Sequence, residues 1–401
     1  MLAFVSLLNS HLTRYFIYFR GVGTRIIHCG SEPSQEFGGV SVPLDFSSTF
    51  AQPAPGQPVV FDYARCGNPT RLAFERQLAS LEQGKFAFAC SSGMAAHLTL
   101  VNTLCQQGDH VLCVDDVYGG TQRYLRKVVG PNAGLEMDFE DFSDIAKFKK
   151  MLRPNTKMVW LETPTNPTIK VYDIAKIAEA CKGHGCIFVV DNTFATPINT
   201  NPLTLGADVV THSVTKYIGG HSDLIAGAII MNSRELYDRL FFVLKTMGTG
   251  LDSFHSWLAV RSCKTLEVRV MQAAKNGMAV AKALEASPKV VKVNYPGLPS
   301  HPQHKVHMKQ SKTGGAMIAF YVKGGIKQAS NFLKALKIFT LAESLGGVES
   351  LAECPVVMTH GSVPKAHRQL LGIEDNFIRL SVGIENEADL VADIKQALAK
   401  M

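Results

Sequence analysis

Short apolar segments alternate with longer amphipathic ones between residues 85 and 235. The apolar segments are bounded by Gly, Pro, Asn or Ser and are rich in β-branched residues, which is typical of buried strands. They predict strands at residues 85–90, 110–114, 158–162, 187–191, 209–212 and 224–231. Helices are expected between them, so this region is predicted to be a mainly parallel sheet covered by helices.

The pattern changes after Pro288. The segments VVKVNYPGL, AMIAFYVKG and FIRLSVGI are predicted strands, and residues 326–336 and 389–400 are predicted helices. We therefore expect a smaller α+β domain at the C-terminal end. The predicted divisions are an N-terminal extension at 1–22, an arm at 23–62, a large domain at 63–262 and a C-terminal domain at 263–401.

Composition and charge disfavour several classes of protein. Of the 401 residues 46% are hydrophobic, yet no apolar run reaches the roughly 18 residues that a membrane-spanning helix needs. The 41 Lys and Arg are interspersed with 34 Asp and Glu, which argues against nucleic acid as a partner. The nine cysteines form no C-x-x-C pair and fit reduced thiols in a reducing compartment. We expect a globular protein that does not span a membrane.

The first twenty residues are apolar, and no acidic residue precedes Glu32. A secretory signal would carry positive charge before its apolar run, whereas Arg14 and Arg20 follow the first such run. A mitochondrial presequence and an extension without a targeting role both stay open, and the cytoplasm is the default location.

A lysine suited to covalent chemistry follows the strand predicted at 209–212, in the segment THSVTKYIGGHSD. Lys216 would lie beyond the carboxyl end of that strand, where open α/β sheets bind their ligands. A desolvated lysine can supply the amine for a Schiff base, which pyridoxal phosphate (PLP) requires. Ser213 and Thr215 could donate hydroxyl groups to a phosphate. Taken alone, this string also fits a surface lysine beside a glycine turn.

Asp191 ends the apolar strand in IFVVDNTFATP, where a carboxylate is costly unless it meets a cation. A protonated pyridine nitrogen of PLP is such a cation. Asp191 and Lys216 are 25 positions apart, enough for one strand-helix-strand return, so we expect them at neighbouring strand ends. A helix cap or turn is the alternative reading of Asp191.

Three other segments carry residues suited to a phosphate, a ring and a carboxylate. In ACSSGMAAHLTL a strand passes into a helix whose first N–H groups, at Gly93 and Met94, could bind a phosphate. Tyr118 could stack on a planar cofactor, with Arg123 nearby. Arg379 lies in an apolar strand, and its guanidinium suits a substrate carboxylate. A capped helix, a surface turn and an outward-facing arginine are the respective alternatives.

Together these segments resemble the Cys/Met-metabolism family of PLP-dependent enzymes, from roughly residue 23 to the C-terminus. The matching segments are YARCGNPTR, SSGMAA, DDVYGGT, ETPTNPT, VVDNTF, THSVTKYIGGHSD, YPGLPSHPQH, LAESLGGVESL and IRLSVGIE. The resemblance implies fold type I, the aspartate-aminotransferase-like fold of PLP-dependent transferases. It also implies PLP as cofactor and a homotetramer, a dimer of dimers with shared active sites.

The resemblance implies roles for residues at matching positions. Lys216 would bind the cofactor and move protons, and Tyr118 would assist beside the ring as the second catalytic residue. The residues expected at the cofactor are Tyr63, Arg65, Gly93, Met94, Tyr118, Asp191, Thr193, Ser213, Thr215 and Lys216. Those expected at the substrate are Tyr63, Arg123, Asn166, Glu343, Ser344 and Arg379. Tyr63 and Arg65 would reach the phosphate of a neighbouring subunit. A turn beside a helix start at residues 68–70 is the alternative reading.

Glu343, in LAESLGG, is the position that best indicates specificity. The γ-lyases and γ-synthases of the family are similar in carrying an acid there, placed to meet the distal ammonium of cystathionine. The implied activity is γ-elimination of L-cystathionine to cysteine, 2-oxobutanoate and ammonia, with hydrogen sulfide release from cysteine as a further expectation. A solvent-facing or capping glutamate is the plainer reading of Glu343.

Several other functions stay open. A γ-synthase shares these residues and is the main alternative. A β-lyase and a methionine γ-lyase are both less favoured, because β-lyases generally lack the acid at 343 and methionine γ-lyases have Cys where this chain has Gly120. A non-catalytic homologue that has kept the fold is the alternative of a different class.

Three histidines recur at helical spacing, at positions 301, 304 and 307. Pro299 and Pro302 disfavour a regular helix there, and neither an acid nor a cysteine completes a ligand set. We therefore expect no metal site at this segment.

Overall fold

The computed structural model describes residues 21–34, 36–359, 361 and 365–401. The chain forms two compact units. Unit 1 comprises Met1–Cys105 and Asn201–Glu267, and unit 2 comprises Gln106–Thr200 and Val268–Met401. The domain boundaries expected near residues 62 and 262 do not coincide with these units and stay predictions.

Unit 1 consists of helices around three strands. Its elements are α2 (Val22–His28), α3 (Pro69–Leu81), β1 (Phe86–Cys90), α4 (Gly93–Leu104), the short 3-10 helix η2 (Pro202–Leu205), β6 (Val209–Ser213), β7 (Gly227–Met231), α10 (Arg234–Met247) and α11 (Ser253–Cys263). Strand β7 lies between β1 and β6 and runs antiparallel to both. Helix α4 packs on β6 and β7, α3 packs on β1, and α10 packs against α4. This packing brings the start of α4 to the end of β6.

Unit 2 contains two groups of strands. The first half contains β2 (His110–Val114), α5 (Gly119–Tyr124), the π-helix η1 (Leu125–Val129), α6 (Gly130–Ala133), β3 (Glu136–Glu140), α7 (Ile145–Met151), β4 (Thr156–Glu162), α8 (Ile174–His184), β5 (Ile187–Asp191) and α9 (Thr196–Asn199). The second half contains α12 (Leu266–Glu285), β8 (Val290–Asn294), α13 (His304–Gln310), β9 (Met317–Val322), α14 (Ile326–Ala335), β10 (Thr340–Leu341), β11 (Leu351–Glu353), α15 (Lys365–Leu370), β12 (Phe377–Ser381) and α16 (Glu387–Ala399).

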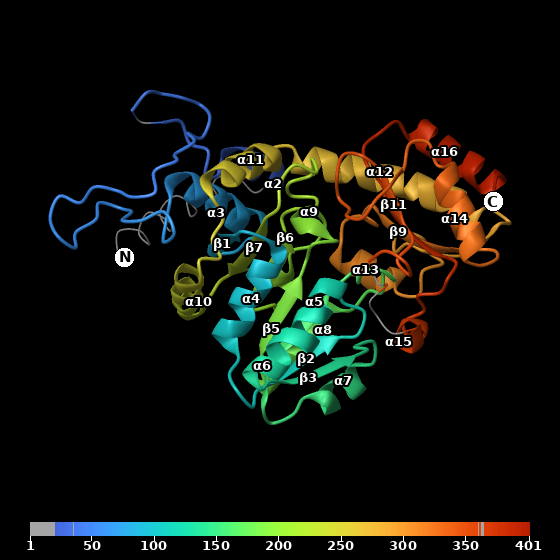
Figure 1. Cartoon of the computed structure of the whole chain (residues 1–401), viewed down its shortest axis with the longest axis horizontal. Coiled ribbons are helices and arrows are strands. Elements are labelled where there is room, and N and C mark those ends of the chain that lie inside the picture. Colours follow the sequence, from blue (N-terminus) through green and yellow to red (C-terminus); the bar gives the residue numbers. More distant parts are fainter. Residues whose placement is uncertain (1–20, 35, 360, 362–364) are drawn as a thin grey trace. The chain divides into compact units, whose positions relative to one another are not determined.

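The first group of strands in unit 2 is parallel. Strand β2 pairs with β3 and β4, and β4 pairs with β5. The carboxyl ends of β2, β4 and β5 therefore meet at one edge, and the segments after them carry several predicted site residues. Helices α5, α7 and α8 are drawn with these strands in green in Figure 1.

The second group forms a five-stranded sheet in the order β10-β11-β12-β9-β8. Here β12 is central and antiparallel to both β11 and β9. Helices α14 and α16 pack together, and both are visible at the C-terminal end in Figure 1. A separate sheet near the C-terminal end of the chain and the α/β class are thus confirmed.

All strands predicted from the apolar segments are present, with small shifts at their ends, but β3, β10 and β11 were not predicted. The sequence of β3 is EMDFE, whose side chains are exposed or half-buried, so it lacks the apolar run that marks the other strands. Strands β10 and β11 have only two and three residues, too few for a periodic pattern.

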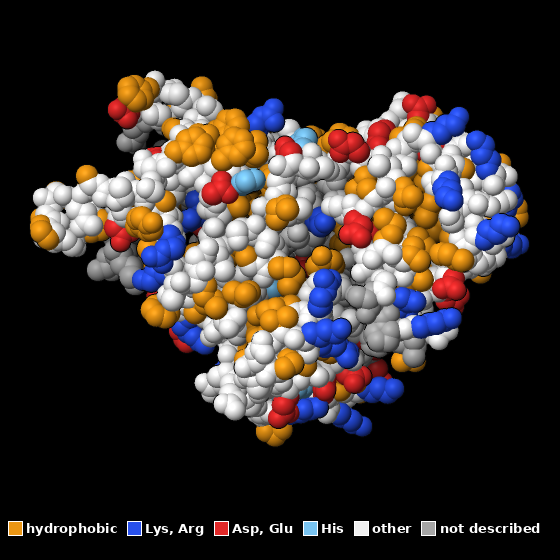
Figure 2. All heavy atoms as spheres, in the orientation of Figure 1, with side chains coloured by type: hydrophobic (Ala, Val, Ile, Leu, Met, Phe, Trp, Pro, Cys, Tyr) orange, Lys and Arg blue, Asp and Glu red, His pale blue; other side chains and the backbone are white. Residues whose placement is uncertain are grey.

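The arm predicted at residues 23–62 exposes large apolar side chains. Phe37 is 83% exposed, Val40 77% and Phe46 72%. In Figure 2 apolar side chains stand out on the two loops at the left, where the arm lies in Figure 1. Several large apolar side chains exposed on one segment are typical of a segment that contacts another protein.

In the part of the chain that the structure describes, no helix combines the length and apolar character required to cross a membrane.

Candidate active site

In unit 1 the start of α4 lies against the end of β6. Ser92 caps the helix, and its Oγ accepts a hydrogen bond from the Ala95 N–H at 3.0 Å. A Cβ on Gly93 would lie 3.2 Å from Cβ and 3.4 Å from Oγ of Ser213. Glycine thus allows the helix start, with the N–H groups of Gly93 and Met94, to approach the Ser213 hydroxyl. A helix start and a hydroxyl together suit a phosphate.

The turn that carries Lys216 is held by backbone hydrogen bonds. The Lys216 N–H donates to Ser213 O at 3.2 Å, and the Gly220 N–H donates to Lys216 O at 2.7 Å. Thr215 Oγ1 accepts from the Ala226 N–H at 3.0 Å, which ties the turn to the segment before β7. Lys216 itself is half-buried. These hydrogen bonds fix the backbone that carries the Lys216 amine. A lysine that must reach one particular atom of a ligand requires such a fixed backbone.

The predicted pair from the arm, Tyr63 and Arg65, lies near the surface of unit 1. The Tyr63 side chain is 47% exposed, and the guanidinium carbon of Arg65 lies 5.6 Å from the centre of its ring. Arg65 Nη1 donates to the carbonyl of Lys245, and Arg71 Nη2 donates to the carbonyl of Arg65 at 3.4 Å. Both side chains are accessible to a second molecule.

In unit 2 the carboxylate of Asp191 ends β5 and is almost fully buried, at 6% exposure. Its Oδ1 accepts hydrogen bonds from the Thr193 N–H at 3.0 Å and from Thr193 Oγ1 at 2.5 Å. These donors stabilise the charged form of the acid. The predicted neighbours Asp191 and Thr193 are therefore in direct contact.

Tyr118 follows β2 in the same unit, and its ring is 41% exposed. A Cβ on Gly120 would lie 2.4 Å from Cε1 of this ring, so the ring lies directly over the glycine backbone. The Tyr118 N–H donates to Oε2 of Glu162 at 3.0 Å. The orientation of Tyr118 thus depends on the absence of a side chain at 120 and on a buried acid.

Arg379, on β12, is brought together with two of its predicted partners. Its Nη1 donates to Asn166 Oδ1 at 2.7 Å, and its Nη2 donates to the carbonyl of Ser344 at 2.9 Å. Ser344 has a φ of 96°, which residues with a side chain rarely adopt, and this conformation presents its carbonyl to the guanidinium. Arg379 is 2% exposed, so its guanidinium is held in one orientation.

The two remaining predicted substrate residues are on the surface of unit 2. Arg123 is exposed on α5. Glu343 is exposed and immediately precedes Ser344, whose carbonyl binds Arg379. The geometry therefore puts an accessible acid one residue from the arginine site.

The comparisons with known proteins identify a family. A model of the Cys/Met metabolism PLP-dependent enzyme family matches residues 23–399. The chain belongs to this family. Fold type I and dependence on PLP follow from the membership.

Individual relatives are similar over nearly the whole chain. The protein named cystathionine gamma-lyase from Dictyostelium discoideum is 50% identical over 380 residues, 94% of this chain and 98% of that one. A protein named cystathionine beta-lyase from Coxiella burnetii is 48% identical over 378 residues, 94% of this chain and 97% of that one. The crystal structure of cystathionine gamma-lyase from Lactobacillus plantarum, complexed with L-serine, covers 95% of this chain and 99% of that chain, with a TM-score of 0.91 and 39% identity.

The family's cofactor fits the residues that the structure describes. In unit 1 the helix start at Gly93 and the Ser213 hydroxyl lie close together, and this pair of donors suits the phosphate of PLP. In unit 2 Asp191 is a buried acid whose charged form is stabilised by two donors, which suits a pyridinium.

Three residues with a visible structural role were missed from the sequence. Glu162 ends the apolar strand MVWLE just as Asp191 ends IFVVD, so the signal that marked Asp191 was present there too. Glu353 pairs with Arg379 but lies in LAECP, where no apolar run marks it. A Cβ on Gly227 would lie 2.1 Å from the carbonyl oxygen of Ser92, so this glycine lets β7 approach the start of α4.

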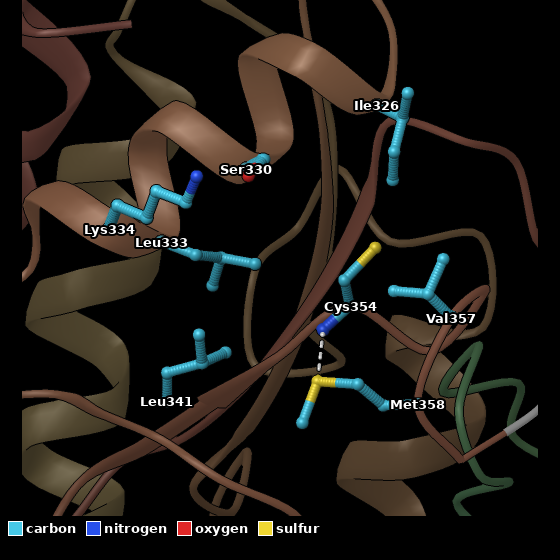
Figure 3. A pocket seen from close by; sticks show the side chains of 8 residues that line it. All are labelled: Ile326, Ser330, Leu333, Lys334, Leu341, Cys354, Val357 and Met358. Atoms are coloured by element: carbon cyan, nitrogen blue, oxygen red, sulfur yellow. Dashed lines mark hydrogen bonds between the residues drawn. The ribbon is translucent and has the colours of Figure 1, made fainter.

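Unit 2 also holds an apolar pocket of about 400 Å³ that contains none of the predicted site residues. Figure 3 shows the side chains that surround it, from α14, β10 and the segment after β11. They are Ile326, Ser330, Leu333, Lys334, Leu341, Cys354, Val357 and Met358. The Cys354 N–H donates to the Met358 sulfur at 3.4 Å across one side of it. The pocket is separate from the contacts of Arg379 described above.

The three histidines at 301, 304 and 307 each hydrogen-bond a backbone carbonyl. His301 Nε2 lies 3.1 Å from the oxygen of Ile169, and His307 Nε2 lies 2.7 Å from that of Thr313. Burial lowers the pKa of His301 to about 4. These side chains link loops of unit 2 through hydrogen bonds to backbone carbonyls.

Proposed function

We propose that this enzyme catalyses γ-elimination of L-cystathionine to L-cysteine, 2-oxobutanoate and ammonia. The observation that carries the proposal is that Ser344, whose carbonyl accepts a hydrogen bond from the buried Arg379, directly follows the exposed Glu343. Cystathionine has an α-carboxylate at one end and an ammonium at the other, so a cation and an acid from this part of the chain suit its two ends. The relatives named cystathionine gamma-lyase support the same assignment.

In this proposal some residues of the chain bind the cofactor and others transfer protons. PLP, when bound, supplies a ring that accepts electrons from the substrate's Cα. We assign Lys216 to covalent attachment of PLP and to moving the proton between Cα and the neighbouring carbons, and Asp191 to holding the proton on the pyridine nitrogen. Tyr118 would cover the PLP ring, and Thr193 orients Asp191 through its two hydrogen bonds.

The phosphate and the α-carboxylate have separate binding groups in the proposal. The phosphate would be bound by N–H and hydroxyl donors of Gly93, Met94, Ser213 and Thr215. Asn166 and Ser344 orient Arg379 for the carboxylate, and Arg123 adds a second cation.

We further propose that the enzyme is a homotetramer in which Tyr63 and Arg65 of one subunit bind the PLP phosphate of the next. The exposed apolar side chains of the arm and the accessible pair at 63 and 65 support this assembly. A cytoplasmic location belongs to the same proposal, and so do a large domain at 63–262 and a C-terminal domain at 263–401.

A product assay on L-cystathionine tests the proposed reaction. Release of cysteine with 2-oxobutanoate is the expected result, and incubation with L-cysteine alone is expected to release hydrogen sulfide more slowly. Homocysteine with pyruvate would instead make the enzyme a β-lyase, as the name of the Coxiella burnetii relative suggests for that protein. Faster condensation of cysteine with an activated homoserine than cleavage of cystathionine would make it a γ-synthase.

A further inference from the structure

Glu162 ends strand β4, and its side chain is buried among predicted site residues of unit 2. The residue is 3% exposed. In the parallel register of β4 and β5, Glu162 lies directly beside Asp191. Side chains at paired positions of neighbouring strands point to the same face, so the two carboxyl groups share one environment.

The Glu162 carboxyl joins two further segments. Its Oε2 accepts the Tyr118 N–H at 3.0 Å, and the carboxyl also accepts a hydrogen bond from the Asn166 backbone. The Glu162 side chain therefore contacts the backbone of Tyr118 and the backbone of Asn166, whose side chain binds Arg379. It also lies next to Asp191.

Two buried carboxylates side by side cannot both be ionised at low cost. The charge of Asp191 is stabilised by two donors from Thr193. Burial and, next, the charge of Asp191 hold the pKa of Glu162 well above its ordinary value. Asp116, after β2, also raises the pKa of Glu162. The buried Cys113 thiol adds no charge, because burial raises the pKa of that thiol. The surroundings of the two side chains thus favour a charged Asp191 and a neutral Glu162.

We propose that Glu162 is a positioning residue that works as the neutral carboxylic acid, fixing Tyr118 and Asn166 around Asp191 without placing a second negative charge there. The inference deepens the proposed function, because it rests on the assignment of Asp191 and Tyr118 to the PLP ring. It predicts that an amide can replace the acid, since an amide also accepts through its oxygen and donates through its nitrogen.

The affinity of the apoenzyme for PLP, and the visible absorbance maximum of bound PLP, test the proposal. E162A is expected to weaken PLP binding by about tenfold or more and to shift the absorbance, because two backbone N–H groups lose their acceptor. E162Q is expected to restore both readouts to within about threefold of the parent enzyme. E140Q, at an exposed glutamate of β3, is the matched control.

An infrared measurement gives an answer that does not depend on how well E162A folds. The difference spectrum between the parent enzyme and E162Q at neutral pH is expected to show the carbonyl band of one protonated carboxylic acid, because the bands of other protonated acids cancel between the two proteins. Absence of that band from the difference spectrum, or equal loss of PLP affinity in E162Q and E162A, would overturn the neutral-acid role. These readouts report on PLP alone, so failure of the cystathionine assay would leave them interpretable.

Discussion

Arg379 and Glu353 form a buried ion pair on neighbouring strands of the five-stranded sheet. Their register places them opposite each other on β12 and β11, with 3.1 Å between Arg379 Nη2 and Glu353 Oε2. The side chains are 2% and 1% exposed, and Thr359 Oγ1 donates to the other oxygen of Glu353 at 3.0 Å. The arginine proposed to bind substrate is thus already compensated by an internal acid.

Removing this acid should affect stability and substrate binding together. E353A leaves the Arg379 guanidinium buried without its acid, which should lower the free energy of unfolding by about 3 kcal/mol. The loosened guanidinium should also raise KM for L-cystathionine by about tenfold. Urea unfolding and steady-state kinetics measure the two effects. The control is E349A, at an exposed glutamate four positions earlier. Unchanged KM in a destabilised E353A would limit Glu353 to a structural role.

The sequence predicted part of this site for a clear reason. Acids and lysines at the ends of apolar segments, such as Asp191 and Lys216, are visible because a charge there breaks an otherwise buried pattern. The roles of Asn166 and Ser344 were implied only by the resemblance. Their hydrogen bonds with Arg379 show that these three residues lie together.

The remaining contacts depend on tertiary structure. Glu353 is paired because β11 lies beside β12, and a three-residue strand leaves no periodic signal. The φ of Ser344 and the ring of Tyr118 over Gly120 are likewise properties of folded loops. Such contacts cannot be read from residue types along the chain.

A side chain at Gly120 should displace the Tyr118 ring. A Cβ there would lie 2.4 Å from ring atom Cε1, a distance at which one of the two groups must move. G120A is therefore expected to weaken PLP affinity by about tenfold with little change in unfolding free energy, since the ring is partly exposed and can swing aside. G183A is the control, because a Cβ at that helical glycine would meet nothing within 4 Å. Wild-type affinity in G120A would show that the ring position is not important for binding PLP.

Replacing Lys216 should remove the covalent attachment of PLP. K216A is expected to lose the visible absorbance of the lysine-bound cofactor and to lower kcat by about a thousandfold or more, because both the nucleophile and the proton carrier are absent. Mass spectrometry after borohydride reduction checks the same site by the mass of the modified peptide. K157A, at an exposed lysine of β4, should keep both properties. A modified lysine elsewhere in the parent enzyme would show the assignment to be wrong.

Glu343 should discriminate between substrates with and without a distal ammonium. An exposed ion pair contributes little, so E343Q should lower kcat/KM for L-cystathionine by only about fivefold. Its effect on L-cysteine or homoserine, which have no second amino-acid group, should be smaller. The ratio of the two kcat/KM values is measured, because a smaller fraction of active enzyme lowers both values by the same factor and leaves their ratio unchanged. Equal losses on both substrates would remove Glu343 from the substrate contacts.

A buried acid in unit 1 should make stability depend on pH. Glu75, on α3, accepts a hydrogen bond from the Ala89 N–H at 3.1 Å and lies 3.7 Å from Arg71 Nε. Burial outweighs these partners and raises the pKa of Glu75 from 4.5 to about 7. The folded protein therefore keeps a proton that the unfolded chain has already released.

The pKa of Glu75 is higher in the folded protein than in the unfolded chain. The contribution of Glu75 to the free energy of unfolding is therefore greatest below pH 4.5, falls as the pH rises to about 7, and then stays level. The loss across this window is about 3 kcal/mol. E75Q should remove the contribution of Glu75 to that slope, since glutamine does not ionise, while the buried Glu162 keeps its own contribution. This holds even if the absolute stability changes because Arg71 loses its acid. Urea unfolding with saturating PLP at several pH values between 5 and 8 measures the slope. E235Q, at an exposed glutamate of α10, should keep it, and a parallel pH profile in E75Q would assign the slope to other groups.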